Sequence, residues 1–410
     1  MAGAHHATHH ATRQAAHYDA IVVGLGAVGA ATLYQLALRG ARVLGIDRFA
    51  PPHDRGSSHG ESRITRLAIG EGDSYVPLVQ RSHAIWRELE ARTGRTLLTQ
   101  TGGLVLAPRD SAANHHGKPD FLRRTIACAE HFGIRHEVLD AAGIRARYPQ
   151  FALQGNEVGY FEPEAGFVRP EEAIAAQLDA ARALGAEVHV GERVDAVDDP
   201  GHGGAVVVRT DAARYSATRV VVAAGPWLPD FLGAPARAAW QPDFEVYRQV
   251  MYWFDAPGAA ADFAPGRLPI FIWMYGDAQE DYMYGFPSAD PARPALKVAT
   301  EQYAVTTTAD ALQREVGDDE AAAMYASRIA GRFPQVTPRA LQTRACMYTV
   351  TPDRHFVVDT LPDAPNVWVA SACSGHGFKH SAGLGEAIAA QLLGRTGGAD
   401  LSAFRRPQRS

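Results

Sequence analysis

The chain has 410 residues, of which 46% are hydrophobic and 21% charged, and its formal net charge is −5. This length favours about two domains with a sizeable core, and the small negative charge argues against a nucleic-acid partner. No apolar run approaches the roughly 18 residues that a membrane helix needs, so we expect no membrane partner. The three cysteines form neither a disulfide framework nor a zinc pattern, which favours a reducing cytoplasm.

Residues 1–17 are polar and rich in alanine and histidine, with no apolar core. We expect a disordered tail here, because a signal peptide would need an apolar segment. Its paired histidines are a metal-binding pattern of low specificity, and we predict no metal site in the protein.

A β-α-β unit follows, with the sequence YDAIVVGLGAVGAATLYQLALRGARVLGID from Tyr18 to Asp47. Gly24 permits the tight turn, Gly26 lets the backbone approach a pyrophosphate, and Gly29 allows close packing of the helix on the strand. Asp47 lies close to the position, roughly 20 residues past the glycines, where a carboxylate accepts hydrogen bonds from an adenosine ribose. This unit predicts a bound dinucleotide, either FAD or NAD.

The next segment is polar and contains the sequence PPHDRGSSHGESRITRLAIGEG. Arg63 and Arg66 are three residues apart, so on a helical turn they would project to one side, with His59 just upstream. Two interpretations stay open, namely a solvated basic turn and an anion site beside the cofactor loop.

The middle of the chain alternates between strands and helices. We expect a strand over 101–108, a helix over 171–184 and a buried strand over 220–224, while 115–149 is polar and has no motif. At Gly225 the backbone can press close to a ligand, although an ordinary core strand followed by a turn is the alternative.

Aromatic residues become frequent after residue 235, in the stretches VYRQVMYWF, PIFIWMYG and DYMYGFPS. Their alternation predicts a broad antiparallel sheet with aromatic side chains on one face, which suits a floor over a flat ring. The alternative for most of these aromatic residues is an ordinary hydrophobic core.

The β-α-β unit, the arginine-containing segment after it, and the later segments CMYTVTPD and SGHGFK resemble the monomeric sarcosine oxidase and N-methyltryptophan oxidase family. These are FAD-dependent amine oxidases of the wider D-amino-acid oxidase group. The resemblance runs from Tyr18 to about Leu393 and is weakest between residues 115 and 156. It implies an α/β fold (α+β overall), in which a Rossmann-like FAD-binding domain is interleaved with a substrate domain built on a large antiparallel β-sheet.

The resemblance also implies that segments of the two domains alternate along the chain. Between an N-terminal tail (1–17) and a C-terminal tail (396–410), we expect three FAD-binding segments, at 18–95, 158–234 and 341–395. Two substrate-domain segments, at 96–157 and 235–340, separate them.

FAD contacts are implied at residues from all three FAD-binding segments. They are Gly24, Gly26, Gly29, Asp47, Ser57, His59, Gly60, Arg63, Gly225, Cys346, Gly375, Gly377, Phe378 and Lys379. In the family the cysteine of the CMYT segment is joined covalently to the flavin, which implies such a link at Cys346. Composition alone would make this thiol an inert buried group, an interpretation that we keep for Cys128 and Cys373.

Substrate contacts are implied by the same resemblance. Arg66 suits a two-pronged grip on a carboxylate and Lys379 adds a point charge, while Tyr284 and Tyr348 lie near the substrate. The chain departs from the family at Glu301, where the sarcosine oxidases have a histidine facing the substrate. A carboxylate there would favour a cationic or larger substrate, so sarcosine itself is in doubt.

The implied reaction moves a hydride equivalent from the amine to FAD N5 and leaves an anionic reduced ring, which nearby positive groups stabilise. The candidates for these groups are His59, Arg63, Lys297 and Lys379. Tyr348 biases the protonation of the amine, and no strong general base is required. The imine then hydrolyses in water, and O₂ reoxidises the flavin to give H₂O₂, with Lys297 attracting the developing superoxide.

We therefore expect a monomeric oxidase that acts on the secondary amine of an N-methyl amino acid, with O₂ as the second small-molecule partner. A cyclic imino acid such as pipecolate, or a glycated amino acid, is an alternative substrate, and an FAD-dependent dehydrogenase is a less favoured alternative activity. An NAD-dependent dehydrogenase is disfavoured by the Cys346 segment. A non-catalytic flavoprotein is disfavoured by the retention of Arg66, Tyr348 and Lys379.

Overall fold

The computed structural model describes residues 17–406 except 202, 233–243, 279, 291 and 293. The predicted N-terminal tail therefore lies outside the described residues, apart from His17, which begins the first strand. None of the described helices is both long and apolar enough to cross a membrane.

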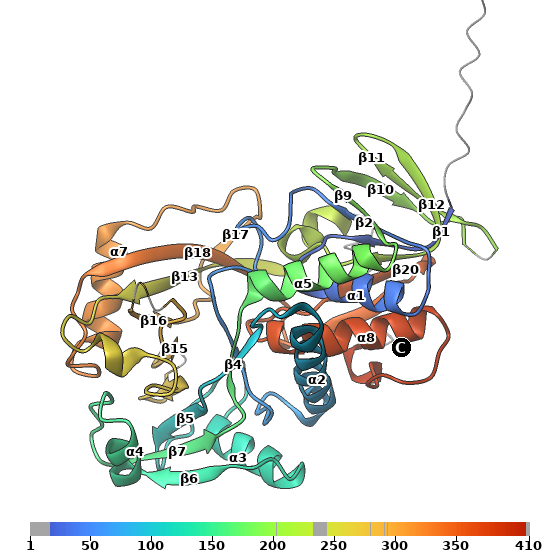
Figure 1. The fold of residues 1–410 in the computed structure, drawn as a ribbon. Coiled ribbons are helices and arrows are strands. Elements are labelled where there is room, and N and C mark those ends of the chain that lie inside the picture. Colours follow the sequence, from blue (N-terminus) through green and yellow to red (C-terminus); the bar gives the residue numbers. More distant parts are fainter. Residues whose placement is uncertain are drawn as a thin grey trace, which may run out of the picture.

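An eight-stranded sheet carries the β-α-β unit (Figure 1). Five strands pair in parallel in the order β9, β2, β1, β12 and β20, and β10, β11 and β19 add antiparallel neighbours. β1 and β2 are nearly continuous apolar runs because both faces of a parallel sheet are covered. The strands are β1 (His17–Val23), β2 (Val43–Asp47), β9 (Glu187–Val190), β10 (Val194–Asp198), β11 (Val206–Thr210), β12 (Arg214–Val222), β19 (Val357–Leu361) and β20 (Ala364–Ser371).

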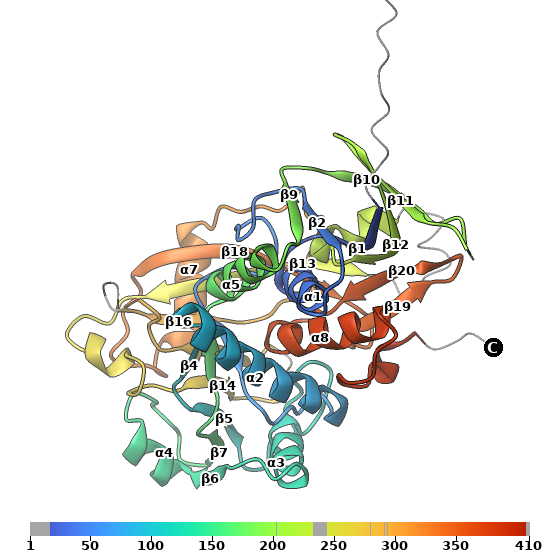
Figure 2. The same ribbon diagram turned by 45° about the vertical axis from the view of Figure 1, so that its right-hand side comes forward.

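Four helices pack together beside this sheet, with α1 against α5 and α8, and α2 against α8 (Figure 2). The crossing of α1 and α8 depends on small residues, since an added Cβ at Gly385 would lie 2.6 Å from the carbonyl carbon of Ala31. The α-helices that lie wholly within the described residues are α1 (Ala27–Leu38), α2 (Val76–Thr93), α3 (Phe121–His131), α4 (Ala141–Arg147), α5 (Pro170–Ala183), α7 (Asp318–Met324) and α8 (Ser381–Leu392).

A nine-stranded sheet forms the other large layer, at the left and bottom of Figure 1. All its pairs are antiparallel except that between β5 and β14, so the predicted fold class is confirmed. Its strands are β5 (Gly103–Pro108), β6 (Glu137–Asp140), β7 (Glu157–Glu162), β13 (Glu245–Phe254), β14 (Ile270–Met274), β15 (Tyr282–Phe286), β16 (Leu296–Ala299), β17 (Thr306–Thr307) and β18 (Ala340–Val350).

The prediction that the aromatic residues share one face of this sheet is wrong. Tyr252 and Phe254 pack in one buried cluster, whereas Trp253 between them packs in another with Met251 and Cys346. Consecutive residues of a strand point to opposite faces, so a run of three aromatic residues must divide between them.

A small third sheet connects the two layers and contains the first of the two arginines. Its strands are β3 (Arg63–Thr65), β4 (Leu98–Gln100) and β8 (Gly166–Val168). The segment around Arg63 is therefore extended, so the helical turn on which Arg63 and Arg66 would project to one side does not form. The pairing of β3 with β8 satisfies its backbone groups instead.

The division into alternating segments stays a prediction, but the sheets cross two of its boundaries. β7 and β18 both belong to the nine-stranded sheet, although most of their residues fall within predicted FAD-binding segments. Both strands pair along most of their length with strands of the substrate-domain segments.

Candidate active site

A cavity of about 460 Å³ lies at the carboxyl ends of β1, β2, β12 and β20, where ligands bind in open α/β sheets. Nine of the predicted FAD-contacting residues line it, namely Gly24, Gly26, Asp47, Ser57, Arg63, Gly225, Gly375, Gly377 and Phe378. Lys379 lines a second cavity instead, and the remaining four, Gly29, His59, Gly60 and Cys346, line neither of these two.

The glycine turn at the N-terminus of α1 leaves room for a ligand. Gly24 has a φ of +86°, and an added Cβ there would lie 2.5 Å from the carbonyl oxygen of Ala223. At Gly29 an added Cβ would lie 1.8 Å from the carbonyl oxygen of Gly24, whereas at Gly26 it would contact only Ser58 Oγ, at 3.8 Å. Gly29 thus serves packing, while Gly26 stands open toward the cavity.

The polar groups around this cavity fit a dinucleotide. The Asp47 carboxylate accepts hydrogen bonds from the amides of Leu25 (2.7 Å) and Phe49 (2.8 Å), which holds it beside the glycine turn. The N-cap residue of α1, Gly26, has no side chain to cap the helix, and the amide of Ala27 makes only a long bond of 3.4 Å to Ser58 Oγ. The helix N-terminus can therefore still bind an anion. The Ser57 hydroxyl is buried without a hydrogen-bond partner. A bound FAD would be held by these groups.

A second, smaller cavity of about 70 Å³ adjoins the first. Arg63, Tyr348, Gly375 and Phe378 line both cavities and so form the wall between them. The small cavity is also lined by five other residues predicted from the sequence, Arg66, Tyr284, Lys297, Glu301 and Lys379.

Two cations in the small cavity meet a buried carboxylate that the sequence analysis missed. Arg66 Nη2 lies 2.7 Å from Glu71 Oε2, and Lys379 Nζ lies 3.7 Å from Glu71 Oε1. Burial opposes ionisation of Glu71, but Arg66 and Lys379 outweigh it and hold the pKa of this carboxyl well below its usual value. The two residues predicted to bind a substrate carboxylate thus already share an internal one.

Lys297 is fully enclosed between the sheets. Its Nζ donates to Gly60 O (2.6 Å), Ser62 O (2.9 Å) and Ser62 Oγ (2.9 Å). Burial, and then Arg63, lowers its pKa well below the usual value. The three acceptors match the three protons of an ammonium group.

His59 does not supply the positive charge that we expected of it. Burial, and then Arg63, lowers the pKa of His59 to about 3, so the imidazole is neutral near pH 7. Nor does its ring line either cavity. The positive group of the shared wall is therefore Arg63. Burial lowers the pKa of Lys379 to about 8, which leaves it largely protonated near pH 7, and the three acceptors around Lys297 Nζ favour its ammonium form.

Cys346 lies behind the shared wall. Its Sγ is 3.8 Å from Arg63 Nη2, and burial raises the pKa of the thiol. The Arg63 guanidinium also donates to Ser57 O at 2.9 Å. In the lining of the small cavity, the hydroxyls of Tyr284 and Tyr348 lie 3.0 Å apart.

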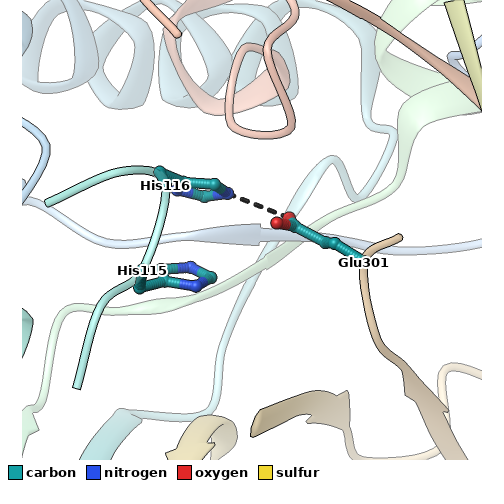
Figure 3. A group of neighbouring side chains, drawn as sticks. All are labelled: His115, His116 and Glu301. Atoms are coloured by element: carbon teal, nitrogen blue, oxygen red, sulfur yellow. Dashed lines mark hydrogen bonds and ion pairs between the residues drawn. The ribbon is translucent and has the colours of Figure 1, made fainter. Parts of the chain in front are cut away.

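Glu301 is paired with a histidine that the sequence analysis also missed. His116 Nε2 lies 2.9 Å from Glu301 Oε1, and His116 Nδ1 lies 3.1 Å from Glu71 Oε1 (Figure 3). His116 lies in the segment 115–149, in which the sequence shows no motif. Nothing in the composition around Glu71 indicates that its carboxylate is buried. The adjacent histidines of the sequence HHG were the only available signal.

His115, His116 and Glu301 offer potential metal-ligand atoms within 4.8 Å of one another, the one such group of three among the described residues. Both ring nitrogens of His116 are already within hydrogen-bond distance of carboxylates. A metal ion would have to displace these charge-assisted bonds, so the geometry favours an ion pair over a metal centre.

Two cavities with a common wall, one that fits a dinucleotide and one with cations for an acid, define a dinucleotide-dependent enzyme. Residues 19–391 match the family model described as FAD dependent oxidoreductase. The chain belongs to this family, so its cofactor is FAD and the resemblance seen in the sequence is confirmed.

Named relatives agree with this assignment. The chain is 40% identical over 378 residues to monomeric sarcosine oxidase of Streptomyces avermitilis, covering 91% of this chain and 92% of the relative. It is 34% identical over 389 residues to N-methyl-L-tryptophan oxidase of Yersinia pestis, covering 94% and 98%. The fold is also similar to that of NikD, an unusual amino acid oxidase, with a TM-score of 0.79, 24% identity and coverage of 95% and 97%.

Proposed function

We propose that this enzyme oxidises the secondary amine of a small N-methyl amino acid to an imine, with O₂ as the final electron acceptor and H₂O₂ as a product. The supporting observation is the pair of cations, Arg66 and Lys379, in a small cavity that shares a wall with the dinucleotide cavity. The names of the relatives support the same reaction class. Bound FAD supplies the acceptor for the hydride equivalent and the site of reaction with O₂.

The substrate carboxylate is bound by Arg66 and Lys379 in place of Glu71. The planar guanidinium of Arg66 offers two parallel donors, and the lysine adds a third. Since Glu71 now neutralises both cations, its side chain has to move aside or share them. The cations then hold the amine end of the substrate toward the wall formed by Tyr348 and Arg63.

Tyr348 and Tyr284 position the amine. Their hydroxyls are hydrogen-bonded to each other at 3.0 Å, and both line the small cavity. Burial raises the pKa of Tyr284 above its usual value, and burial likewise raises the pKa of Tyr348 well above its usual value. Both phenols therefore stay protonated and act as hydrogen-bond donors or acceptors rather than as bases.

Lys297 and Arg63 supply positive charge beside the flavin, and Lys297 favours the reaction with O₂. Cys346 on β18, whose Sγ lies 3.8 Å from Arg63 Nη2, forms the covalent link to FAD. The three free cysteines support a reducing cytoplasm. We propose a monomer, as the name of the Streptomyces relative states for that protein.

The central experiment is a peroxide-coupled screen with N-methyl, cyclic and glycated amino acids. We expect small N-methyl amino acids to give the highest kcat/KM, because the cavity is only about 70 Å³. A cyclic imino acid or a glycated amino acid is the alternative, and preference for either would replace the proposed substrate. Release of no peroxide from any of them would reject the proposed function.

Arg66→Lys tests the carboxylate site within the same screen. This variant keeps the charge but loses the two-pronged donor, so KM for the amino acid should rise at least tenfold while the flavin content stays unchanged. Lys118→Arg, on the turn outside the small cavity, is the matched control. An unchanged KM in Arg66→Lys would reject the role of the arginine.

A further inference from the structure

The ion pair of His116 and Glu301 is held from both sides. Glu301 Oε1 faces His116 Nε2 at 2.9 Å, and Glu301 Oε2 accepts a hydrogen bond from Tyr303 OH at 2.6 Å. His116 Nδ1 in turn faces Glu71 Oε1 at 3.1 Å. With both ring nitrogens directed at carboxylates, the ring is an imidazolium that donates twice. Both oxygens of Glu301 are therefore occupied.

This pair stands where the two cavities meet. An added Cβ at Gly375 would lie 2.9 Å from His116 Nε2 and 3.0 Å from Glu301 Oε1. Gly375 lines both the dinucleotide cavity and the small cavity. His116 and Glu301 thus adjoin the wall against which the reacting amine is held, and Figure 3 shows them approaching each other from two separate segments.

A tight turn delivers the imidazole to this position. His115 and Lys118 exchange backbone hydrogen bonds of 3.1 and 3.0 Å, and His116 and Gly117 between them have φ of +52° and +73°. A positive φ is unfavourable for histidine and is retained only where the surrounding structure holds it. The His115 ring, packed at 4.7 Å from the rings of both Phe121 and Tyr282, anchors the turn.

We propose that His116 masks the charge of Glu301, so that the substrate amine beside it is held as the neutral base rather than as the ammonium ion. The inference rests on the proposed function and names a positioning residue for it. Only an amine with a free lone pair can give up a hydride equivalent, and the proton that it loses goes to solvent. An unmasked carboxylate within about 4–6 Å would stabilise the ammonium form by about 1–3 pKa units.

Several other groups face the pair and define its charge balance. Burial disfavours the charged form of His116, but Glu301 and Glu71 outweigh it and raise the pKa of His116. The neighbouring rings of His115 and His376 are neutral, because burial holds the pKa of each well below its usual value. The other charged or titratable groups around the pair include Tyr282, Tyr284, Tyr303, Tyr348, Arg66 and Lys379. His116 is thus the group that compensates Glu301 directly.

The pH profile of kcat at saturating concentrations of a small N-methyl amino acid tests the masking, because kcat reports the pKa of the bound amine. In His116→Gln the limiting pKa should rise by about one unit or more, which lowers kcat about tenfold on the acid side. In the double variant His116→Gln/Glu301→Gln it should return to the wild-type value, because there is no carboxylate left to unmask. His131→Gln, at the exposed end of α3 and outside both cavities, is the control and should leave the limiting pKa in place. An unmoved profile in His116→Gln, or a shift that persists in the double variant, overturns the proposal.

Binding supplies a readout that does not depend on turnover. Glycine and glycolate have nearly the same shape but differ in charge at the amine position, and calorimetry without oxygen gives their Kd for the holoenzyme. The ratio of the Kd for glycolate to the Kd for glycine should be about tenfold larger in His116→Gln than in wild type. In the double variant this ratio should return to the wild-type value. An equal preference in His116→Gln and wild type refutes masking. If wild type oxidises none of the amines, the proposed function fails, while this comparison still decides on the masking.

Discussion

Replacement of Glu71 by Gln is a direct test of the buried charge cluster. The Glu71 and Arg66 side chains are each 2% exposed, with 2.7 Å between the charged atoms, and Lys379 lies 3.7 Å from the same carboxylate. Removing one partner of a buried ion pair costs about 3–5 kcal/mol, because the other charge is left uncompensated. With an unfolding entropy of about 2.1 cal/mol/K per residue, this lowers Tm by about 4–6 °C.

Thermal unfolding with and without acetate measures this effect. Acetate should restore stability to Glu71→Gln, by about 2.7 kcal/mol at 100 times its Kd, because its carboxylate replaces the lost one. Wild type should gain much less, since acetate must first displace Glu71. Sodium chloride at equal ionic strength controls for screening. Glu137→Gln, which breaks the exposed pair with Arg147, should cost less than about 1 kcal/mol. The reasoning would be refuted if Glu71→Gln lost no more stability than Glu137→Gln. It would also be refuted if acetate stabilised Glu71→Gln and wild type equally.

Four further outcomes are expected. Acid-precipitated wild type should stay yellow through its thioether, whereas Cys346→Ser should release its flavin to the supernatant; equal release would exclude the covalent link. Lys297→Met should slow reoxidation by O₂ in stopped flow and spare anaerobic reduction by substrate, and equal effects on both would count against its role. Gly29→Ala should destabilise the fold, since its Cβ would lie 1.8 Å from a carbonyl oxygen, whereas Gly26→Ala should weaken FAD binding with Tm of the apoprotein unchanged; the reverse pattern would contradict this assignment. Burial lowers the pKa of His83 to about 4, so the unfolded state binds a proton more readily than the folded state between pH ~6.5 and 4. The contribution of the neutral ring to the free energy of unfolding is therefore complete above pH ~6.5 and is lost as the pH falls toward 4, by up to about 1.4 kcal/mol per pH unit. In urea unfolding at several pH values, the free energy of unfolding of His83→Gln should depend less steeply on pH than that of wild type.

The fold was predictable where local sequence determines it. Glycines and apolar runs predicted the β-α-β unit over Tyr18–Asp47, which the structure forms as β1, α1 and β2, because this unit depends on short-range geometry. The same reasoning failed for Arg63, whose extended conformation is set by pairing with β8 about a hundred residues away. It failed also for the aromatic strands, since spacing alone did not show which face each side chain would take.

The site was predictable to the extent that motifs mark it. Arg66, Lys379 and Tyr348 line the small cavity, as the resemblance implied. His116 was missed because its partners lie far away in the chain, 45 residues away at Glu71 and 185 residues away at Glu301. Glu71 was missed because no motif marks it, although its partner Arg66 is only five residues away. The expectation that Glu301 would present a free carboxylate was incomplete for the same reason. Sequence showed the replacement of one residue but not its compensating partner.

The walls of the dinucleotide cavity extend from Val23 to Ser381 along the chain, and this separation affects how the protein is made. During synthesis the β-α-β unit emerges before the other walls of the cavity and can fold early. The cavity cannot enclose a cofactor until the segment before α8 has also left the ribosome. Only a chain that includes this segment can gain the full stability that a bound ligand confers. Cofactor binding therefore distinguishes such chains from chains truncated before this segment, which remain open to proteolysis.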